Sequence, residues 1–462
     1  MTLTLGQVAD WIHAEGDFDS EAKAEGYSID SRTVAAGELF FAVQGERFDG
    51  HDFVAAAFKN GAVAAVVSTH WVVPADVDSA KLLRVPEGEE CVLRALQQLA
   101  NAVRRYWSGR VIGITGSAGK TTTKECVAAV LAAKFRVLKS AGNLNNGYGV
   151  PLQLLRLQPE HEFAVIEMGM NHAGEIAALA QIAQPDWGVV SNVAPVHLEH
   201  FADGIVGVAA AKYELVQSLP MNGIAFLNAD DAHVSTFGRD REGFVRFFGL
   251  HAETADARAT DVTSAGAEGM RFVVHAQGKT VAVHIALLGE HNVYNALAGI
   301  AVGLEAGIAL DDCIRALATL LPGDKRGEQI VFRGARILND SYNSNPRALN
   351  AMVDALMAVE ATRHIVIAGE MLELGPDAAA FHAECGEYMR AHGVDVVIGV
   401  RGFARDLVRG AADIAQFVEA PEEAGVWMLE NLREGDAVLL KASRGVRLER
   451  ALVPLGLQST GH

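Results

Sequence analysis

The segment Val111–Thr123 constrains the fold of this chain more than any other stretch. It begins with Val and Ile residues typical of a short buried strand. The loop that follows, residues 116–119, consists of small residues whose backbone N–H groups can face an anion. Lys120 adds a positive charge, and Thr121 adds a hydroxyl suited to Mg²⁺. Residues 122–133 are compatible with a helix, so the order predicts a phosphate at a helix N-terminus.

This loop departs from the strict P-loop pattern, which requires a glycine at position 114, where this chain has Ile114. We interpret it as a shorter variant, Gly-x-x-Gly-Lys-Thr-Thr. An ordinary glycine-rich turn with a solvated lysine is the alternative, but strand, glycines, Lys-Thr and helix stand in the order that phosphate binding needs. The predicted ATP-binding residues of the loop are Gly116, Ser117, Ala118, Gly119, Lys120, Thr121 and Thr122.

Composition narrows the class of protein. A chain of 462 residues should hold about three domains. The net charge of −18 argues against sequence-independent binding of nucleic acids, which needs a cationic surface. The four cysteines are far apart, without metal spacing or a disulfide framework, so we expect a reducing cytoplasm. We see no signal peptide and no apolar run long enough to span a bilayer, and therefore expect no membrane insertion.

The chain divides into three predicted α/β units: residues 1–88, 89–320 and 321–462. The first unit contains strand candidates at 39–43 and 62–67, with a helix at 52–61 between them. The third contains strand candidates at 336–338, 364–368, 394–397 and 437–441, with helices between them, which predicts a Rossmann-like domain. The segment 321–328 is a plausible linker.

The central unit alternates strands and helices, which predicts a doubly wound, mainly parallel sheet. The strands are expected at 111–115, 163–167, 187–192 and 223–227, and the helices at 120–133, 174–182 and 208–219. From about 243 to 288 the pattern changes to short alternating runs, which predicts an antiparallel annex. A helix-rich stretch at 292–318 closes the unit.

Polar residues follow the central strands where ligands of parallel sheets gather. Glu167 ends one strand, His197 follows another, and Asn145 and Asn146 lie in a polar, glycine-rich loop. A carboxylate and a neutral imidazole near a P-loop threonine are reasonable partners for Mg²⁺ and phosphate. Taken alone, His197 is more often a satisfied histidine than a ligand.

Two further features are ambiguous from composition. Asp30-Ser-Arg32 and the loop 44–51 are compact polar clusters, for which ordinary turn chemistry is the favoured interpretation. Lys212 lies on a predicted helix, and the simplest interpretation is a surface lysine. If it were desolvated near Mg²⁺, its pKa would fall, and it could carry a CO₂-derived carbamate.

Together these residues resemble the Mur ligase family, the ATP-dependent amino-acid ligases of peptidoglycan precursor synthesis. The resemblance covers essentially the whole chain in three-domain order. It is carried by the short P-loop, by Glu167-Met-Gly, by Asn192 with His197 and by Lys212, fifteen positions after that histidine. Further matching segments are Gly289-Glu-His-Asn-Val-Tyr-Asn-Ala296 and Asn339-Asp-Ser-Tyr-Asn-Ser-Asn-Pro346.

The resemblance implies a ligase that joins a carboxylate to an amine through an acyl phosphate. Lys120, Glu167, His197 and Lys212 would be catalytic, and two Mg²⁺ ions would be held by Thr121, Glu167, His197 and carbamylated Lys212. Asn292, Asn295 and Arg326 would face the nucleotide base, and Asp340 the ribose or the domain interface. The substrate-binding residues would be Ser31, Arg32, Glu46, Arg47, Asn145, Asn146, Tyr342, Asn343 and Asn345.

Within the family, the N-terminal polar clusters are similar to a UDP-sugar-binding domain, and the 339–346 and 369–375 segments resemble the branch that adds a dipeptide. The implied substrates are UDP-N-acetylmuramoyl-tripeptide, D-Ala-D-Ala and ATP, and we expect a monomer. A departure is Asp324-Lys-Arg-Gly-Glu328, where a Gly-Arg pair before the acidic residue is commoner.

Three alternatives stay open at this point. A ligase that adds the third residue of the peptide shares the chemistry, but should carry a basic stretch and a later Asp-Asn-Pro-Arg motif, which this sequence lacks. Folylpolyglutamate synthetase should lack the domain that contains Asp30-Ser-Arg32. A P-loop NTPase that acts as a switch or motor should respond to a macromolecular partner.

Overall fold

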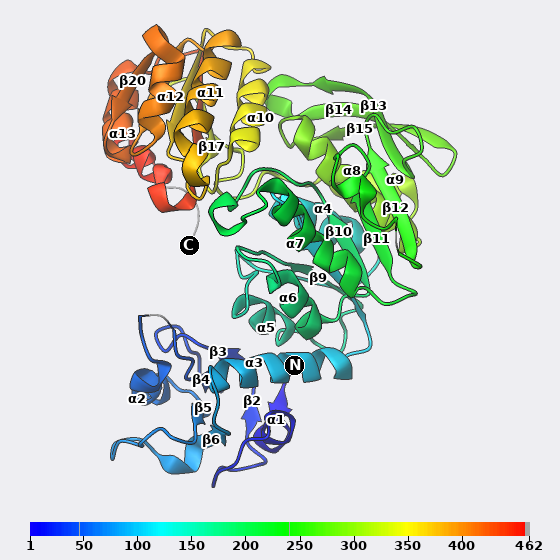
Figure 1. Ribbon diagram of the computed structural model, residues 1–462, viewed down its shortest axis with the longest axis vertical. Coiled ribbons are helices and arrows are strands. Elements are labelled where there is room, and N and C mark those ends of the chain that lie inside the picture. Colours follow the sequence, from blue (N-terminus) through cyan, green and yellow to red (C-terminus); the bar gives the residue numbers. More distant parts are fainter. Residues whose placement is uncertain (46, 240, 458–462) are drawn as a thin grey trace.

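The computed structural model describes residues 1–45, 47–239 and 241–457. It has three α/β domains in chain order, with the central domain between the other two (Figure 1). This agrees with the expected fold class of a doubly wound central sheet, an antiparallel annex and a Rossmann-like C-terminal domain. No helix in the described part of the chain is both long and apolar enough to cross a membrane.

The N-terminal domain is built on a parallel sheet of order β3-β4-β5-β6. Its strands are β3 (Gly26–Ser28), β4 (Glu38–Phe41), β5 (Ala64–Ser68) and β6 (Leu82–Val85). A short antiparallel pair, β1 (Leu3–Thr4) and β2 (Lys23–Ala24), lies beside α1 (Leu5–Ile12). The predicted helix at 52–61 is the 3₁₀ turn η1 (Gly50–Phe53) followed by α2 (Val54–Lys59).

Helix α3 (Cys91–Tyr106) connects the N-terminal and central domains, and the sequence interpretation did not include it. One face of α3 packs against α1 and β5, and it also packs against α5 (Gly149–Leu154) and α6 (Glu175–Ala183) of the central domain. Its apolar residues therefore join one continuous core that extends from the first strand of the chain to the central sheet. This helix lies between the two domains in Figure 1.

The central sheet has the order β15-β14-β13-β12-β11-β10-β7-β9-β8 in the described residues. The strands from β8 to β13 in this order pair in parallel, and β14 runs antiparallel to both of its neighbours, β13 and β15. The strands are β7 (Arg110–Thr115), β8 (Val137–Lys139), β9 (Phe163–Glu167), β10 (Trp187–Val190), β11 (Ile224–Asn228), β12 (Phe244–Gly249), β13 (Ala257–Ser264), β14 (Met270–Ala276) and β15 (Lys279–Ile285).

One expectation for this domain needs correction. The antiparallel annex does not begin at 243, because β12 extends the parallel sheet beside β11. The helix-rich stretch 292–318 is confirmed and consists of two helices, α8 (Glu290–Glu305) and α9 (Leu310–Ala318). They are separated at Gly307, whose φ of 75° ends the first helix in the left-handed region that glycine adopts without a steric penalty.

Alternating residues of the central strands face two cores. On one face, Val111 and Ile166 pack with α3, α5, α6 and α7 (Ile205–Ser218). On the other, Ile112 and Val165 pack with α4 (Lys120–Ala132), α8 and α9. Because successive side chains of a strand point to opposite faces, a sheet covered on both sides needs the continuous Val and Ile runs seen here.

The C-terminal sheet has the order β16-β17-β21-β18-β19-β20, with β16 antiparallel and the others parallel. Its strands are β16 (Glu328–Phe332), β17 (Ala335–Asp340), β18 (Arg363–Gly369), β19 (Val396–Val400), β20 (Ala415–Val418) and β21 (Asp436–Lys441). Its helices are α10 (Pro346–Met357), α11 (Ala378–Ala391), α12 (Ala404–Ala411) and α13 (Pro421–Asn431).

Candidate active site

A cavity of about 760 Å³ lies where the carboxyl ends of the central and C-terminal sheets meet. The central domain contributes the P-loop, the end of β9 and the start of α8. The C-terminal domain contributes residues that follow β17 and β21. Parallel α/β sheets bind ligands outside the carboxyl ends of their strands, so two such ends facing each other form a site for two groups that must react.

Two glycines of the P-loop lie where a side chain would be crowded and the backbone strained. A Cβ on Gly116 would stand 2.0 Å from the Ser191 hydroxyl oxygen. Gly119 has a φ of 77°, and its Cβ would stand 3.0 Å from the Asn295 Oδ1 atom. These close approaches leave the loop backbone facing the start of α4, where N–H groups without helical partners favour an anion.

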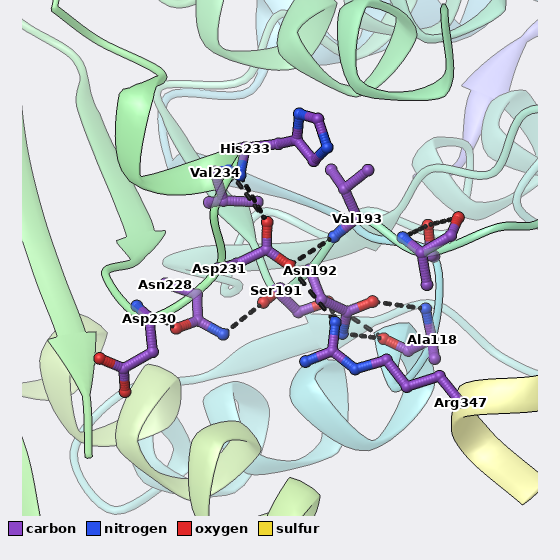
Figure 2. Close-up of polar contacts among 12 residues, drawn as sticks. Ala118, Ser191, Asn192, Val193, Asn228, Asp230, Asp231, His233, Val234 and Arg347 are labelled. Carbon is purple, nitrogen blue, oxygen red and sulfur yellow. Dashed lines mark hydrogen bonds and ion pairs between the residues drawn. The ribbon is translucent and has the colours of Figure 1, made fainter. Parts of the chain in front are cut away.

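Asn192 fixes the P-loop from the neighbouring strand. Its Oδ1 accepts the N–H of Ala118 at 2.9 Å, and its Nδ2 donates to the carbonyl of Ala118, also at 2.9 Å. Beside it, the Ser117 hydroxyl accepts the N–H of Ala194 at 2.8 Å. The loop after β10 therefore sets the shape of the phosphate-binding loop (Figure 2).

The P-loop lysine and threonine both face charged groups. Lys120 donates from Nζ to the carbonyl of Gly116 at 2.9 Å, and burial lowers its pKa, with Glu167 opposing that shift and Arg326 adding to it. Thr121 donates its hydroxyl to Glu167 at 2.8 Å. Asn145 donates its amide to the other oxygen of that carboxylate at 2.9 Å. Glu167 is buried, so these two donors compensate its charge.

Lys212 is not a surface residue. It lies on α7 with 2 % of its surface exposed, and its side chain makes no hydrogen bond within the described residues. Burial lowers its pKa well below the ordinary value, and the nearby positive charge of Lys120 lowers it further. A buried ammonium without partners is strongly unfavourable, so the surroundings of Lys212 favour the neutral amine over the charged form.

His197 lines the cavity, and a residue of the C-terminal domain contacts its other side. Its Nδ1 atom is buried and forms an ion-pair contact with Glu373, at ion-pair distance but without the angles of a hydrogen bond. The imidazole holds the pKa of Glu373 below its ordinary range. Sequence reasoning missed Glu373, because nothing local relates it to a histidine in another domain.

The predicted nucleotide residues have different surroundings. Asn295 is buried, where its oxygen accepts the Thr123 hydroxyl at 2.8 Å and its amide donates to Asn292 at 2.8 Å. Asn292 and Arg326 line the cavity. The Arg326 guanidinium lies 3.9 Å from the ring centre of Tyr342.

The C-terminal part of the cavity is rich in cations that sequence reasoning missed. Lys441 forms an ion pair with Asp340 and donates to the carbonyl of Asn343 at 3.0 Å. Arg444 lies 5.2 Å from the ring centre of Tyr342. Lys441 ends β21 and Arg444 follows it, so the signal that selected Glu167, a polar residue at the end of a buried strand, would have found them.

Two predicted substrate-binding residues accept backbone N–H groups at the starts of helices. Asn345 is the N-cap of α10, where its side chain accepts the N–H of Ala348 at 2.9 Å. Asn146 accepts the N–H of Gly149 at 2.9 Å at the start of α5. Both side-chain oxygens are thus occupied by the backbone, and their contact with substrate stays a prediction.

The N-terminal residues are not brought to this cavity in the described part of the chain. Arg32 is exposed and bound by the Asp30 carboxylate at 2.9 and 2.6 Å. Ser31 is buried, and its carbonyl accepts the Asn60 amide at 2.7 Å. Arg47 is exposed, and Glu46 lies outside the described residues.

Comparisons with known proteins agree with this architecture. Three family descriptions match: "Mur ligase family, catalytic domain" at residues 23–141, "Mur ligase middle domain" at 114–303 and "Mur ligase, glutamate ligase domain" at 325–444. The UDP-N-acetylmuramoyl-tripeptide–D-alanyl-D-alanine ligase of Escherichia coli is 36 % identical over 100 % of this chain and 99 % of its own length.

Solved structures agree as well. MurF from Acinetobacter baumannii has a TM-score of 0.89 at 28 % identity, covering 98 % of this chain and 99 % of its own. MurF ligase from Thermotoga maritima, solved in complex with ADP, has a TM-score of 0.82 at 31 % identity, covering 93 % of this chain and 96 % of its own. With full-length relatives, three matching domains and a P-loop facing a second domain, the chain belongs to the Mur ligase family.

Proposed function

We propose that this chain is an ATP-dependent ligase that joins D-Ala-D-Ala to UDP-N-acetylmuramoyl-tripeptide in peptidoglycan precursor synthesis. The observation that carries the proposal is the shared cavity: the P-loop lines one side, and cations of the C-terminal domain line the other. A simple NTPase needs only the first side. The full-length relatives that bear this activity in their names favour the same substrates.

The reaction has two steps. A carboxylate oxygen of the tripeptide attacks the γ-phosphorus of ATP, the bond to the bridging oxygen breaks, and ADP leaves. The amine of D-Ala-D-Ala then attacks the acyl carbon, phosphate leaves with the acyl C–O bond broken, and the nitrogen loses a proton. Anionic groups converge in both steps, so neutralising and positioning them accounts for most of the catalysis.

Lys120 is suited to the β- and γ-phosphates, because it begins α4 beside the open backbone of the P-loop. Lys441 and Arg444 approach from the opposite wall of the cavity. We propose that these cations hold the acyl phosphate and the incoming dipeptide while water is excluded. Tyr342, Asn343 and Asn345 would border the dipeptide.

The residues present fit Mg²⁺. Thr121 and Glu167 lie 2.8 Å apart and offer the oxygen ligands that Mg²⁺ prefers. No group of three or more His, Cys, Asp or Glu side chains in the described chain forms a metal site by itself. Phosphate oxygens must therefore complete the coordination, which suits an ion that arrives with ATP. Bound there, Mg²⁺ would neutralise the phosphate charge.

A second ion fits His197 and Lys212 only if the lysine is modified. The neutral amine of Lys212 can attack CO₂, which forms an N–C bond and releases one proton, leaving a carbamate. The carbamate carries a charge of −1, where an ammonium would carry +1, and it offers oxygen ligands for Mg²⁺. The burial of Lys212 and its lack of a hydrogen-bond partner among the described residues support this proposal.

The remaining predicted residues keep their proposed roles. Asn292, Asn295 and Arg326 would face the base, and Asp340 the ribose or the domain interface. Asn145 and Asn146 would face the phosphates or the UDP-sugar. Arg32 and Arg47 would bind the uridine diphosphate portion, with Ser31 and Glu46 beside them, and the segment 321–328 would be the hinge of a monomeric enzyme.

A substrate panel tests the proposal. Phosphate release is measured with several UDP-N-acetylmuramoyl peptides, each with D-Ala-D-Ala, with a free diamino acid or with no amine. We expect release to require both the tripeptide and D-Ala-D-Ala. Phosphate release with UDP-N-acetylmuramoyl-dipeptide and a diamino acid would instead identify the third-residue ligase. Release without any UDP-N-acetylmuramoyl peptide would identify an NTPase. Lys120→Ala is the control for contaminating ATPase.

A further inference from the structure

Two loops from different domains meet beside the cavity. His197 belongs to the loop between β10 and α7, and Glu373 to the loop after β18. Their ion-pair contact is on the Nδ1 side of the imidazole. His197 also lines the cavity, so the ring stands between the C-terminal domain and the reaction space.

Both residues of this contact adopt an unusual backbone conformation. His197 has a φ of 56° and Glu373 a φ of 64°, in the left-handed region that residues with a Cβ seldom adopt. Such conformations persist where the surrounding structure imposes them, and they are frequent at functional sites. The backbones are also close, because a Cβ on Gly375 would stand 3.5 Å from the Glu199 nitrogen.

The loop that presents Glu373 is anchored on both sides. The N–H of Met371 donates to Nε2 of the buried His382 at 2.8 Å, and the N–H of Leu372 donates to the Ser443 hydroxyl at 2.9 Å. Met371 and Leu374 are buried in the C-terminal core. The C-terminal domain therefore fixes the position of the loop that presents this carboxylate.

We propose that Glu373 is a positioning residue that, after a small rotation of its carboxylate, accepts the Nδ1–H of His197 and leaves Nε2 unprotonated toward the cavity. A carboxylate beside one ring nitrogen selects the tautomer with the proton on that nitrogen. Only an unprotonated nitrogen can bind a metal ion. This inference rests on the proposed function, in which His197 holds Mg²⁺.

The consequence is a link between domain position and metal binding. Glu373 is carried by the C-terminal domain, while the histidine, the P-loop and Glu167 belong to the central domain. Nε2 of His197 is held unprotonated for metal binding only when the C-terminal domain is close enough for Glu373 to accept the Nδ1–H. The metal site would thus be completed in the same arrangement that brings the amine substrate to the acyl phosphate.

The tautomer of His197 tests the inference without substrate or metal. The metal-free full-length protein, labelled with ¹⁵N-histidine, is studied by NMR at a pH above the ordinary histidine pKa of about 6.5. The resonances of His197 are assigned from their loss in His197→Gln. We expect the Nδ1–H tautomer in the wild type and a shift toward Nε2–H, which predominates in free histidine, in Glu373→Ala.

Two further variants make the result decisive. Glu373→Gly removes the carboxylate and suits the φ of 64°, so it should fold and show the same shift as the alanine variant. Arg347→Gln removes a second ion pair between these domains, 3.5 Å from Arg347 to Asp231, and should leave the tautomer unchanged. An Nε2–H tautomer in the wild type, or no change in Glu373→Gly, would overturn the inference.

The Mg²⁺ dependence of the ligase gives a second readout. Loss of an outer partner of a metal ligand commonly weakens metal binding about 10–100-fold. We expect Glu373→Gly to raise the Mg²⁺ concentration for half-maximal rate about tenfold or more, and to change the KM for UDP-tripeptide less than about twofold. A wild-type enzyme without ligase activity would refute the proposed function but not this inference. An active enzyme in which the His197 tautomer is the same with and without Glu373 would refute only this inference.

Discussion

Asp231 is a buried carboxylate behind the loop that holds the P-loop, and its replacement by Asn gives a sharp prediction (Figure 2). One of its oxygens accepts the N–H groups of His233 and Val234, both at 3.1 Å. The other accepts the N–H of Val193 at 3.0 Å and pairs with Arg347 of the C-terminal domain at 3.5 Å.

An asparagine cannot serve both sides of this network. If its oxygen faces His233 and Val234, its NH₂ group opposes the N–H of Val193 and the Arg347 guanidinium. If it is reversed, two N–H groups lose their acceptor. A hydrogen bond to a charged group contributes about 1.5–3 kcal/mol, and a buried N–H left unpaired costs about 1–3 kcal/mol. We therefore expect Asp231→Asn to lose about 2–4 kcal/mol of stability.

Arg347→Gln is the matched control, because it removes only the ion pair. The Arg347 side chain is 58 % exposed, and a pair of this kind contributes about 0.2–1 kcal/mol. By calorimetry, Asp231→Asn should lower the Tm of the central domain by about 5–10 °C, and Arg347→Gln by no more than about 2 °C.

The same substitution should also weaken ATP binding. Val193 is the neighbour of Asn192, which clamps both backbone groups of Ala118 in the P-loop. We expect Asp231→Asn to raise the KM for ATP about tenfold, equivalent to about 1.4 kcal/mol. Equal Tm values for the two variants, or an unchanged KM for ATP in a destabilised Asp231→Asn enzyme, would refute this reasoning.

Substitutions at three other residues test the site. Lys120→Ala should fold normally and lose on the order of a thousandfold in rate, and turnover within about tenfold of wild type would exclude the P-loop assignment. Lys212→Ala should be nearly inactive and partly rescued by acetate, whereas Lys212→Arg should not be rescued. Wild-type enzyme depleted of CO₂ should lose activity and recover it with bicarbonate. A fully active Lys212→Ala enzyme would contradict the carbamate. Arg47→Ala should raise the KM for the UDP-peptide and leave that for ATP nearly unchanged, since an equal rise in both would place the UDP site elsewhere.

The local pattern was sufficient where local physics decides the structure. The strand and helix around the P-loop, β7 and α4, agree with prediction within a residue, because a buried Val-Ile run and a glycine turn determine both. Helix α3 was missed although its signal was present: Val92, Leu96, Leu99 and Val103 recur at helical spacing. The parallel pairing of β12 was not predictable, since strand direction depends on a neighbour elsewhere in the chain.

The site residues also differ in whether the local sequence could predict their surroundings. Glu167 and Thr121 could be placed together because the end of β9 and the loop that leads from β7 into α4 lie at the same edge of the sheet. The burial of Lys212 could not, because a lysine among alanines on a helix is equally consistent with a solvated face. The Glu373 contact with His197 depends on how two domains meet, which no local pattern contains.

The central claim is that the tripeptide carboxylate attacks ATP directly, and an isotope experiment tests it most directly. UDP-N-acetylmuramoyl-tripeptide labelled with ¹⁸O in the reacting carboxylate is incubated with ATP and D-Ala-D-Ala, and the released phosphate is examined by mass spectrometry. An acyl phosphate passes one carboxylate oxygen to phosphate, so the account predicts one ¹⁸O atom in each phosphate released. Phosphate without ¹⁸O would mean that water attacks ATP, which would contradict the account.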